Sequence, residues 1–499
     1  MRAVQSSEFS ANGLDPALFF SVVYIRARPA AGEETTMGAD ETRGPDGPAQ
    51  SESDTNTGGL RGAWAAGRSV VDRAVLDRDS RSYLRQAVST PCLTSIVGAE
   101  GVHLIGADGA RYLDFHGNSA HQIGYGHPRL VDALTRQLRE LPFVPRRFTS
   151  EISVSFAEKL VEVTPAGLDR VLLTTGGSDA IEVALKLARA ATGRFKTLSF
   201  WESFHGAGFG AASVGGEQLF RTGPIGPLLT GAEHVPPIGC FRDRFGAGHR
   251  FDEPHTADCG RSLAELVDYT LRVQGDVAAV IAEPMRAVPE MAAPGFWQAV
   301  RRSCDATGTL LIFDEIPTGL GRTGRMFSSE HEGVTPDILV LGKGLGGGVV
   351  PVAAVVAREE LDVGEAWAFG HYTHEKNPLM ARAGLTTLQI IEDEGLVARS
   401  AELGAIALAR SAALAERFGA IGDVRGRGLM VGIELVRDDG RTADPALAEA
   451  VLYGCLRRGL SFKTTMGNVL TLTPPLVVSE AELDEAFNIV EASLAEAIG

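Results

Sequence analysis

Short apolar runs alternate with amphipathic stretches from about residue 93 onward, and this alternation constrains the fold more than any other feature of the chain. The strand-like runs are residues 170–174, 197–200, 277–282, 309–313 and 337–341. Between the first two lies a helical pattern, residues 178–191, whose apolar face is formed by Ile181, Ala184, Leu185 and Ala188. Strands that alternate with helices form a mostly parallel sheet covered on both faces. We therefore expect an α/β fold.

Two segments do not follow this alternation. Residues 1–58 are rich in Ser, Gly, Pro, Asp, Glu and Thr, so we expect a disordered N-terminal extension. Met37 precedes its most polar part, and translation starting there is an alternative to translation of residues 1–36. Residues 222–262 are dense in Gly, Pro, His and Arg with little periodicity, which predicts a surface insertion or an active-site wall.

Charge and cysteine content exclude several classes of protein. The 499 residues include 47 Lys and Arg against 63 Asp and Glu, a net charge of −16 that argues against nucleic acid or an anionic membrane as partner. No apolar run approaches the ~20 residues of a membrane span. The five cysteines are scattered and odd in number, which is typical of reduced thiols in the cytoplasm and predicts neither disulfides nor a metal site.

Ligands of open α/β sheets bind beyond the carboxyl ends of the strands, so the residues that follow each strand are candidates for the site. Gly177 and Ser178 open the helix after residues 170–174, where free N–H groups and the helix dipole suit a phosphate; a plain turn and cap is the alternative. Phe204 follows the next strand and could stack on a flat ring, or simply pack on the core.

Two charged residues follow later strands. Asp314 ends a buried strand, where a carboxylate is costly unless it meets a cation, so it either pairs with a protonated nitrogen or caps the next turn. Lys343 stands among glycines, which leave room for a cofactor; because a desolvated lysine is a good amine nucleophile, the loop suggests imine chemistry. A phosphate cradle, a ring stacker, an anion and a reactive lysine are together what pyridoxal phosphate (PLP) requires of a protein.

These residues resemble the class III aminotransferases, PLP enzymes of the aspartate-aminotransferase fold, over about residues 117–476. The matching motifs are Gly177-Ser178-Asp179, Phe204-His205-Gly206, Ala282-Glu283-Pro284, Asp314-Glu315, Gly321-Arg322-Thr323-Gly324, Lys343, and Thr373 ahead of Asn377-Pro378. The resemblance implies a large PLP-binding domain, residues 116–384, and a small α/β domain built from both chain ends, residues 59–115 and 385–499.

The resemblance also assigns roles to single residues. Lys343 would carry the cofactor covalently and act as the catalytic base, Gly177 and Ser178 would hold its phosphate, Phe204 its ring and Asp314 its protonated ring nitrogen. Thr373 matches a threonine that reaches the phosphate in the neighbouring subunit. The implied protein is an obligate homodimer with shared active sites, acting on a small-molecule amine.

The chain departs from the family where substrates bind. Many members carry an arginine at the position of Thr471 to bind a substrate carboxylate, and a threonine cannot make that bidentate charged contact. Pro317 stands where the family usually has Gln or His against the phenolic oxygen of the cofactor. Arg146 and Arg147 lie in the region that helps form the substrate pocket, so we expect them to bind a phosphonate or phosphate dianion, with solvent-facing arginines as the alternative.

The stretches 142–149 and 371–378 resemble the aminophosphonate-degrading ammonia-lyase branch of the family. This likeness implies elimination of ammonia from 1-hydroxy-2-aminoethylphosphonate to give phosphonoacetaldehyde. Transfer of an amino group from an amine or ω-amino acid to a 2-oxo acid is the alternative. A non-catalytic protein on the same scaffold is disfavoured because only chemistry requires both Lys343 and Asp314.

Overall fold

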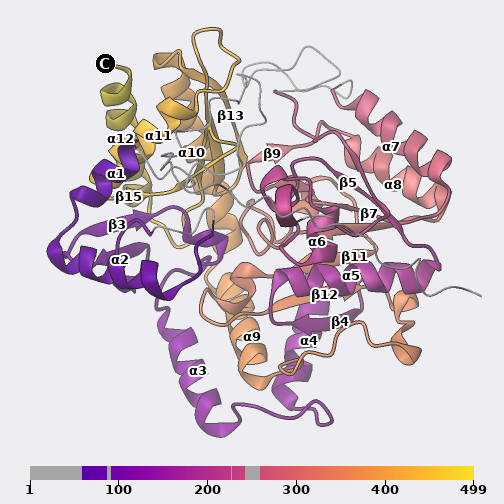
Figure 1. Cartoon of the computed structure of the whole chain (residues 1–499). Coiled ribbons are helices and arrows are strands. Elements are labelled where there is room, and N and C mark those ends of the chain that lie inside the picture. The colour runs from indigo at the N-terminus through magenta and orange to yellow at the C-terminus, as the bar shows by residue number, and fades with distance from the viewer. Residues whose placement is uncertain (1–58, 87–91, 226–227, 242–258) are drawn as a thin grey trace, which may run out of the picture. The chain divides into compact units, whose positions relative to one another are not determined.

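The computed structural model describes residues 59–86, 92–225, 228–241 and 259–499 (Figure 1), all within one compact unit, Pro48–Gly499. The extension expected at residues 1–58, with its second start at Met37, lies outside the described residues. None of the helices in the described part of the chain combines the length and the apolar character needed to cross a bilayer.

A seven-stranded sheet forms the centre of the fold, in the order β4-β12-β11-β10-β7-β5-β6. Only β12 runs against its neighbours, so the sheet is mostly parallel, as expected. Its strands are β4 Arg170–Thr174, β5 Lys196–Phe200, β6 Ala232–Val235, β7 Val277–Ala282, β10 Leu310–Asp314, β11 Ile338–Leu341 and β12 Ala353–Ala357.

Different helices cover the two faces of this sheet because side chains alternate along its buried strands. In β7, Ala279 and Ile281 pack in the same core as the apolar face of α5, whereas Val280 joins the core of the opposite face. Figure 1 shows α5 running across the sheet. The helices of the sheet are α4 Glu151–Val163, α5 Gly177–Thr192, α6 Phe209–Val214, α7 Arg261–Gln274, α8 Phe296–Thr307 and α9 Pro378–Asp393; α3, Pro128–Glu140, packs on α9.

Two smaller sheets are built from the ends of the described chain. The first joins β1, β2 and β3 from the N-terminal part to β15 from the C-terminal part. The second is antiparallel, in the order β13-β14-β17-β16. Their strands are β1 Ile96–Glu100, β2 His103–Gly106, β3 Arg111–Asp114, β13 Ile421–Arg427, β14 Met430–Leu435, β15 Leu460–Ser461, β16 Lys463–Thr465 and β17 Val469–Leu472.

The remaining helices lie beside these two sheets in Figure 1. They are α1 Gly59–Ala66, α2 Val70–Ser82, α10 Leu396–Arg417, α11 Pro445–Arg457 and α12 Glu480–Ile498, and a two-stranded ribbon of β8 Met285–Arg286 and β9 Glu290–Met291 follows β7. The mixed origin of the first sheet accords with a small domain made from both chain ends, but the domain limits at residues 115 and 385 stay a prediction.

All five expected strands and the expected helix 178–191 are found within one residue of their predicted limits. The prediction for residues 222–262 was wrong in part, because this segment contains β6, which extends the sheet beside β5. Its four residues include Glu233 and His234, so this edge strand lacks the apolar run that marks the central strands. Residues 242–258 of the same segment lie outside the described residues.

Candidate active site

The candidate residues follow strands that lie side by side. The order β11-β10-β7-β5 is wholly parallel, so Lys343, Asp314, Glu283 and the Phe204 loop emerge at the same edge of the sheet. β4 runs in the same direction, because β12 is antiparallel to both β4 and β11. The structure therefore brings the helix start at Gly177 to the carboxyl edge as well.

Asp314 and His205 form a buried pair at this edge. His205 Nδ1 lies 2.8 Å from Asp314 Oδ2, and both side chains are almost completely buried. The other carboxylate oxygen accepts a hydrogen bond from the Ile316 N–H at 3.0 Å. Burial raises the pKa of the adjacent Glu283, an effect that Asp314 reinforces and His205 opposes. Asp314 is therefore a fixed, hydrogen-bonded acceptor suited to a protonated nitrogen.

The start of α5 is joined to the Phe204 loop by a close contact. The cap residue is Gly176, and the Ser178 hydroxyl accepts a hydrogen bond from the Ala207 N–H at 3.1 Å. Gly206 adopts φ +129°, and a Cβ there would overlap Ser178 Oγ, so the approach requires glycine. The N-terminus of a sixteen-residue helix at the sheet edge is a good place for a phosphate group.

Lys343 begins a short 3₁₀ turn, Lys343–Gly346, with an unusual backbone conformation. Its φ of +46° lies in the left-handed region that non-glycine residues rarely adopt, and such strain concentrates at functional sites. The next residue must be glycine, because a Cβ at Gly344 would overlap the buried Gln122 side chain. Lys343 itself is exposed, contrary to the desolvated lysine expected from sequence.

Phe204 lies on the same edge but is not buried in the core. Its side chain is 39% exposed, and its ring packs against Phe220 with centroids 4.7 Å apart. An aromatic ring held on one side by a neighbour and open on the other suits stacking on a planar ligand.

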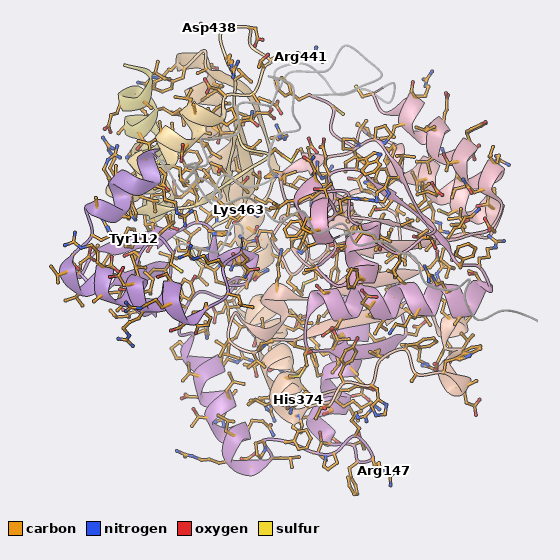
Figure 2. All side chains as sticks on the ribbon, in the orientation of Figure 1. Tyr112, Arg147, His374, Asp438, Arg441 and Lys463 are labelled. Carbon is orange, nitrogen blue, oxygen red and sulfur yellow. The ribbon has the colours of Figure 1, made fainter. Side chains whose placement is uncertain are left out.

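The residues expected at the substrate pocket and subunit interface form a separate group. Arg146, Arg147 and Thr373 are all exposed, and the Arg146 guanidinium contacts His371. Asn377 Nδ2 lies 3.5 Å from the Pro142 carbonyl oxygen, so the stretches 142–149 and 371–378 lie together. Figure 2 shows Arg147 at the periphery, near His374. Their roles toward a substrate or a second subunit stay predictions.

The sequence analysis missed the segment that follows β3. The Asp114 carboxylate accepts hydrogen bonds from the N–H groups of His116 and Gly117 and from the Tyr125 hydroxyl, which fixes this turn. The segment packs on the Lys343 loop through the contact of Gln122 with Gly344. β3 has only two apolar residues between Arg111 and Asp114, so it lacks the apolar run that marked the other strands in the sequence.

This edge of the sheet therefore combines an amine, a buried carboxylate, an open aromatic ring and a helix N-terminus, as in enzymes that bind a phosphorylated aromatic cofactor. The model of the aminotransferase class-III family matches residues 85–494, and the chain belongs to this family. PLP is the cofactor of the family. The residues present fit that group, because they include a buried acceptor at Asp314, an exposed amine at Lys343 and the N-terminus of α5. His205 Nε2 is also buried with no hydrogen-bond partner among the described residues.

Individual relatives are similar over most of their length. The chain is 42% identical to (R)-1-hydroxy-2-aminoethylphosphonate ammonia-lyase of Vibrio splendidus (strain 12B01), covering 90% of this chain and 95% of that protein. It is 33% identical to the alanine/serine racemase of Pyrococcus horikoshii, covering 78% and 83%. A crystal structure of an amine transaminase from an uncultivated Pseudomonas species, in its PLP-bound form, superposes with a TM-score of 0.76 at 31% identity, covering 83% and 98%.

Proposed function

We propose that this chain is a PLP-dependent ammonia-lyase that converts 1-hydroxy-2-aminoethylphosphonate to phosphonoacetaldehyde and ammonia. The observation that carries the proposal is the 42% identity to the Vibrio splendidus lyase over nearly the whole of both chains. The geometry at Thr471 supports it. This side chain is fully buried, and its hydroxyl lies 2.7 Å from that of Thr465, so it offers nothing to the carboxylate of a 2-oxo acid.

The residues at the sheet edge fit the cofactor in the way the family resemblance implies. Lys343 would hold it covalently through Nζ, the first N–H groups of α5 at Gly177 and Ser178 would bind its phosphate, and Phe204 would cover its ring. Asp314, oriented by His205, would bind the protonated ring nitrogen. When bound, PLP withdraws electrons from the carbon that carries the substrate nitrogen.

Lys343 is the general base of the proposed reaction. Its Nζ, released when the substrate amine takes its place, removes a proton from the carbon bearing nitrogen, and the hydroxyl on the neighbouring carbon leaves as water after taking up a proton. One water is then consumed when the carbon–nitrogen bond of the product is hydrolysed. The sum is loss of ammonia from the substrate, with no oxidant, reductant or 2-oxo acid.

The proposal includes a cytoplasmic homodimer with shared active sites. The exposed group of Arg146, Arg147 and Thr373 supports it, because residues of a shared site stay exposed until a second subunit covers them. In that dimer Thr373 reaches the phosphate bound by the neighbouring subunit, and the two arginines border the substrate pocket.

Ammonia release from 1-hydroxy-2-aminoethylphosphonate tests the reaction, using purified PLP-loaded protein with and without pyruvate or 2-oxoglutarate. We expect equal release in both cases and a loss of at least about a thousandfold in Lys343→Ala, because the variant has no amine at the reacting carbon. Lys186→Ala is the matched control, since Lys186 lies on the exposed side of α5. Consumption of amine only with a 2-oxo acid would contradict the lyase.

Transamination is the second candidate function. The superposition with the amine transaminase favours it, because the fold and the family are the same. In that case an amine donor and a 2-oxo acid would be converted in equal amounts, and a cation other than a side chain at position 471 would bind the carboxylate.

A further inference from the structure

A lysine stands directly opposite Thr471 in the small antiparallel sheet. β16 and β17 form a hairpin in which Lys463 pairs with Thr471, so the two side chains project from the same face as cross-strand neighbours. Such neighbours have Cβ atoms about 5 Å apart. The positive charge that many family members place at position 471 is therefore present one strand away in this chain.

This hairpin contacts the residues around the carboxyl edge at both of its ends. At one end, the Thr473 hydroxyl donates to the carbonyl of Phe115 at 3.1 Å and lies 3.3 Å from that of His116. At the other end, Met466 Sδ lies 3.8 Å from Nη2 of Arg286, which follows Glu283 by three residues. The hairpin thus extends from the segment after β3 to the turn after β7.

His116 connects the hairpin to the Lys343 loop. β15 pairs with β3 in parallel, and the pairing continues beyond β3, where the Phe115 N–H donates to the Ser461 carbonyl at 2.7 Å. In this register His116 lies opposite Lys463. Beyond His116 the chain packs on the Lys343 loop. Burial, the charge of Lys463 and, more weakly, that of Lys343 lower the pKa of His116 to about 3, an effect that Asp114 opposes. The strand register therefore places His116 beside Lys463, and the segment that follows His116 packs on the Lys343 loop.

We infer that Lys463 and His116 form the subsite that binds the phosphonate of the substrate beside Lys343. The inference rests on the proposed function and names the residues that give it its substrate class. Lys463 supplies a compact positive charge and the neutral imidazole of His116 supplies a hydrogen bond, and both suit a tetrahedral dianion. An arginine fork at position 471 would suit a planar carboxylate instead.

Other cations near the edge are less suited to this role. Arg286 is bonded to Glu290 and to the Glu202 carbonyl, and its planar guanidinium suits a carboxylate better than a tetrahedral dianion. Arg146 and Arg147 belong to the exposed group on the stretch 142–149; Figure 2 shows Lys463 in the centre of the view and Arg147 at its lower edge. Lys463 is half-buried and lies in the hairpin whose end contacts the segment that packs on the Lys343 loop.

Binding of 2-hydroxyethylphosphonate, an amine-free analogue, tests the subsite independently of catalysis. Calorimetric titration of the PLP-loaded protein should show a Kd at least about tenfold weaker in Lys463→Gln, since a charge-assisted contact is lost. Lys463→Arg should restore binding to within about threefold, because the charge is kept. Lys159→Gln, which removes a lysine of α4 that pairs with Glu162 and Glu392, is the matched control.

Two further readouts separate binding from a structural role. Lys463→Gln should raise KM for the aminophosphonate with little change in kcat, and the visible absorbance of the PLP-loaded protein should stay as in the wild type. Unchanged analogue binding in Lys463→Gln overturns the subsite, and so does a wild type that binds no analogue at millimolar concentration.

Different experimental results would contradict the proposed subsite and the proposed reaction. Ammonia release by the wild type with unchanged binding in Lys463→Gln would leave the lyase standing and remove the subsite. Binding that depends on Lys463 without any ammonia release would support the subsite and remove the proposed reaction. Weaker binding in Arg147→Gln with unchanged binding in Lys463→Gln would assign the phosphonate to Arg147 and overturn the inference.

Discussion

The buried carboxylate of Asp314 makes the turn cap that its sequence position suggested and also contacts a ring nitrogen of His205. One oxygen accepts from the Ile316 N–H, which is the turn cap, and the other faces His205, which holds the carboxylate toward the edge of the sheet. A buried carboxylate is costly unless it is hydrogen-bonded, so the turn cap and the His205 contact both stabilise Asp314 in this position. His205 is therefore a positioning residue, which acts through Asp314.

Replacing His205 should weaken both the fold and the hold on the cofactor. We expect His205→Leu to lower the free energy of unfolding by about 2 kcal/mol, because it leaves a buried oxygen of Asp314 without a partner. kcat should fall by about tenfold or more, and the pH titration of visible absorbance of the PLP-loaded protein should shift. His205→Gln, which keeps a donor, should recover most of the loss. A His205→Leu variant with wild-type absorbance at every pH would exclude a positioning role.

Most candidate residues at the carboxyl edge of the sheet could be selected from the sequence. Their contacts depend on how distant strands align, which the sequence does not reveal. Gly177, Phe204, Asp314 and Lys343 could be selected as candidates because each lies at the end of an expected strand or within four residues of it. The pairing of Lys463 with Thr471 depends on the alignment of two short strands, which no periodicity in the chain encodes. In the same way, the His205–Asp314 contact joins residues 109 positions apart and arises only because β5, β7 and β10 are neighbours.

At the level of elements, the start of α5 and the Phe204 loop form one unit. Their closest approach is at Gly206, whose φ and lack of a Cβ let the loop lie on Ser178. The contact sets how the loop carrying Phe204 and His205 meets the helix N-terminus, so the ring and phosphate positions of the candidate site depend on each other.

Gly206→Ala should therefore reduce PLP affinity by about tenfold or more, because the added methyl group forces the loop off the helix and the loss of fit is of the order of 1–3 kcal/mol. Equilibrium dialysis against PLP, or the fraction of PLP retained after gel filtration, measures the effect. Gly193→Ala is the matched control: Gly193 ends the same helix with φ +67° and has open space around its Cβ position. Equal losses in the two variants would show that backbone strain alone is responsible.

Across the whole described chain, several histidines are held neutral by burial rather than by one local partner. Burial lowers the pKa of His116 to about 3 and those of His234 and His331 to about 4, and neighbouring arginines or lysines reinforce each shift. His116 follows β3, His234 lies in β6 and His331 ends the short 3₁₀ turn Ser328–His331. The effect on the pKa is therefore spread over distant parts of the fold. In the unfolded chain, each imidazole returns to a pKa of about 6.5.

The folding stability depends on pH because the folded and unfolded chains bind different numbers of protons. Below about pH 6.5 these imidazoles become protonated in the unfolded chain but stay neutral in the folded chain. Their contribution to the free energy of unfolding is therefore fully present above that pH and is lost as the pH falls toward 4. The melting temperature should therefore drop between pH 7.5 and pH 5. His331→Gln, which keeps a donor for the Thr323 carbonyl, should reduce the difference in unfolding free energy between these pH values by about 1 kcal/mol, a figure that allows for the partial exposure of the ring. His103→Gln in β2 is the control, and equal slopes for the wild type and both variants would mean that carboxylates, not buried imidazoles, govern the acid limit of this fold.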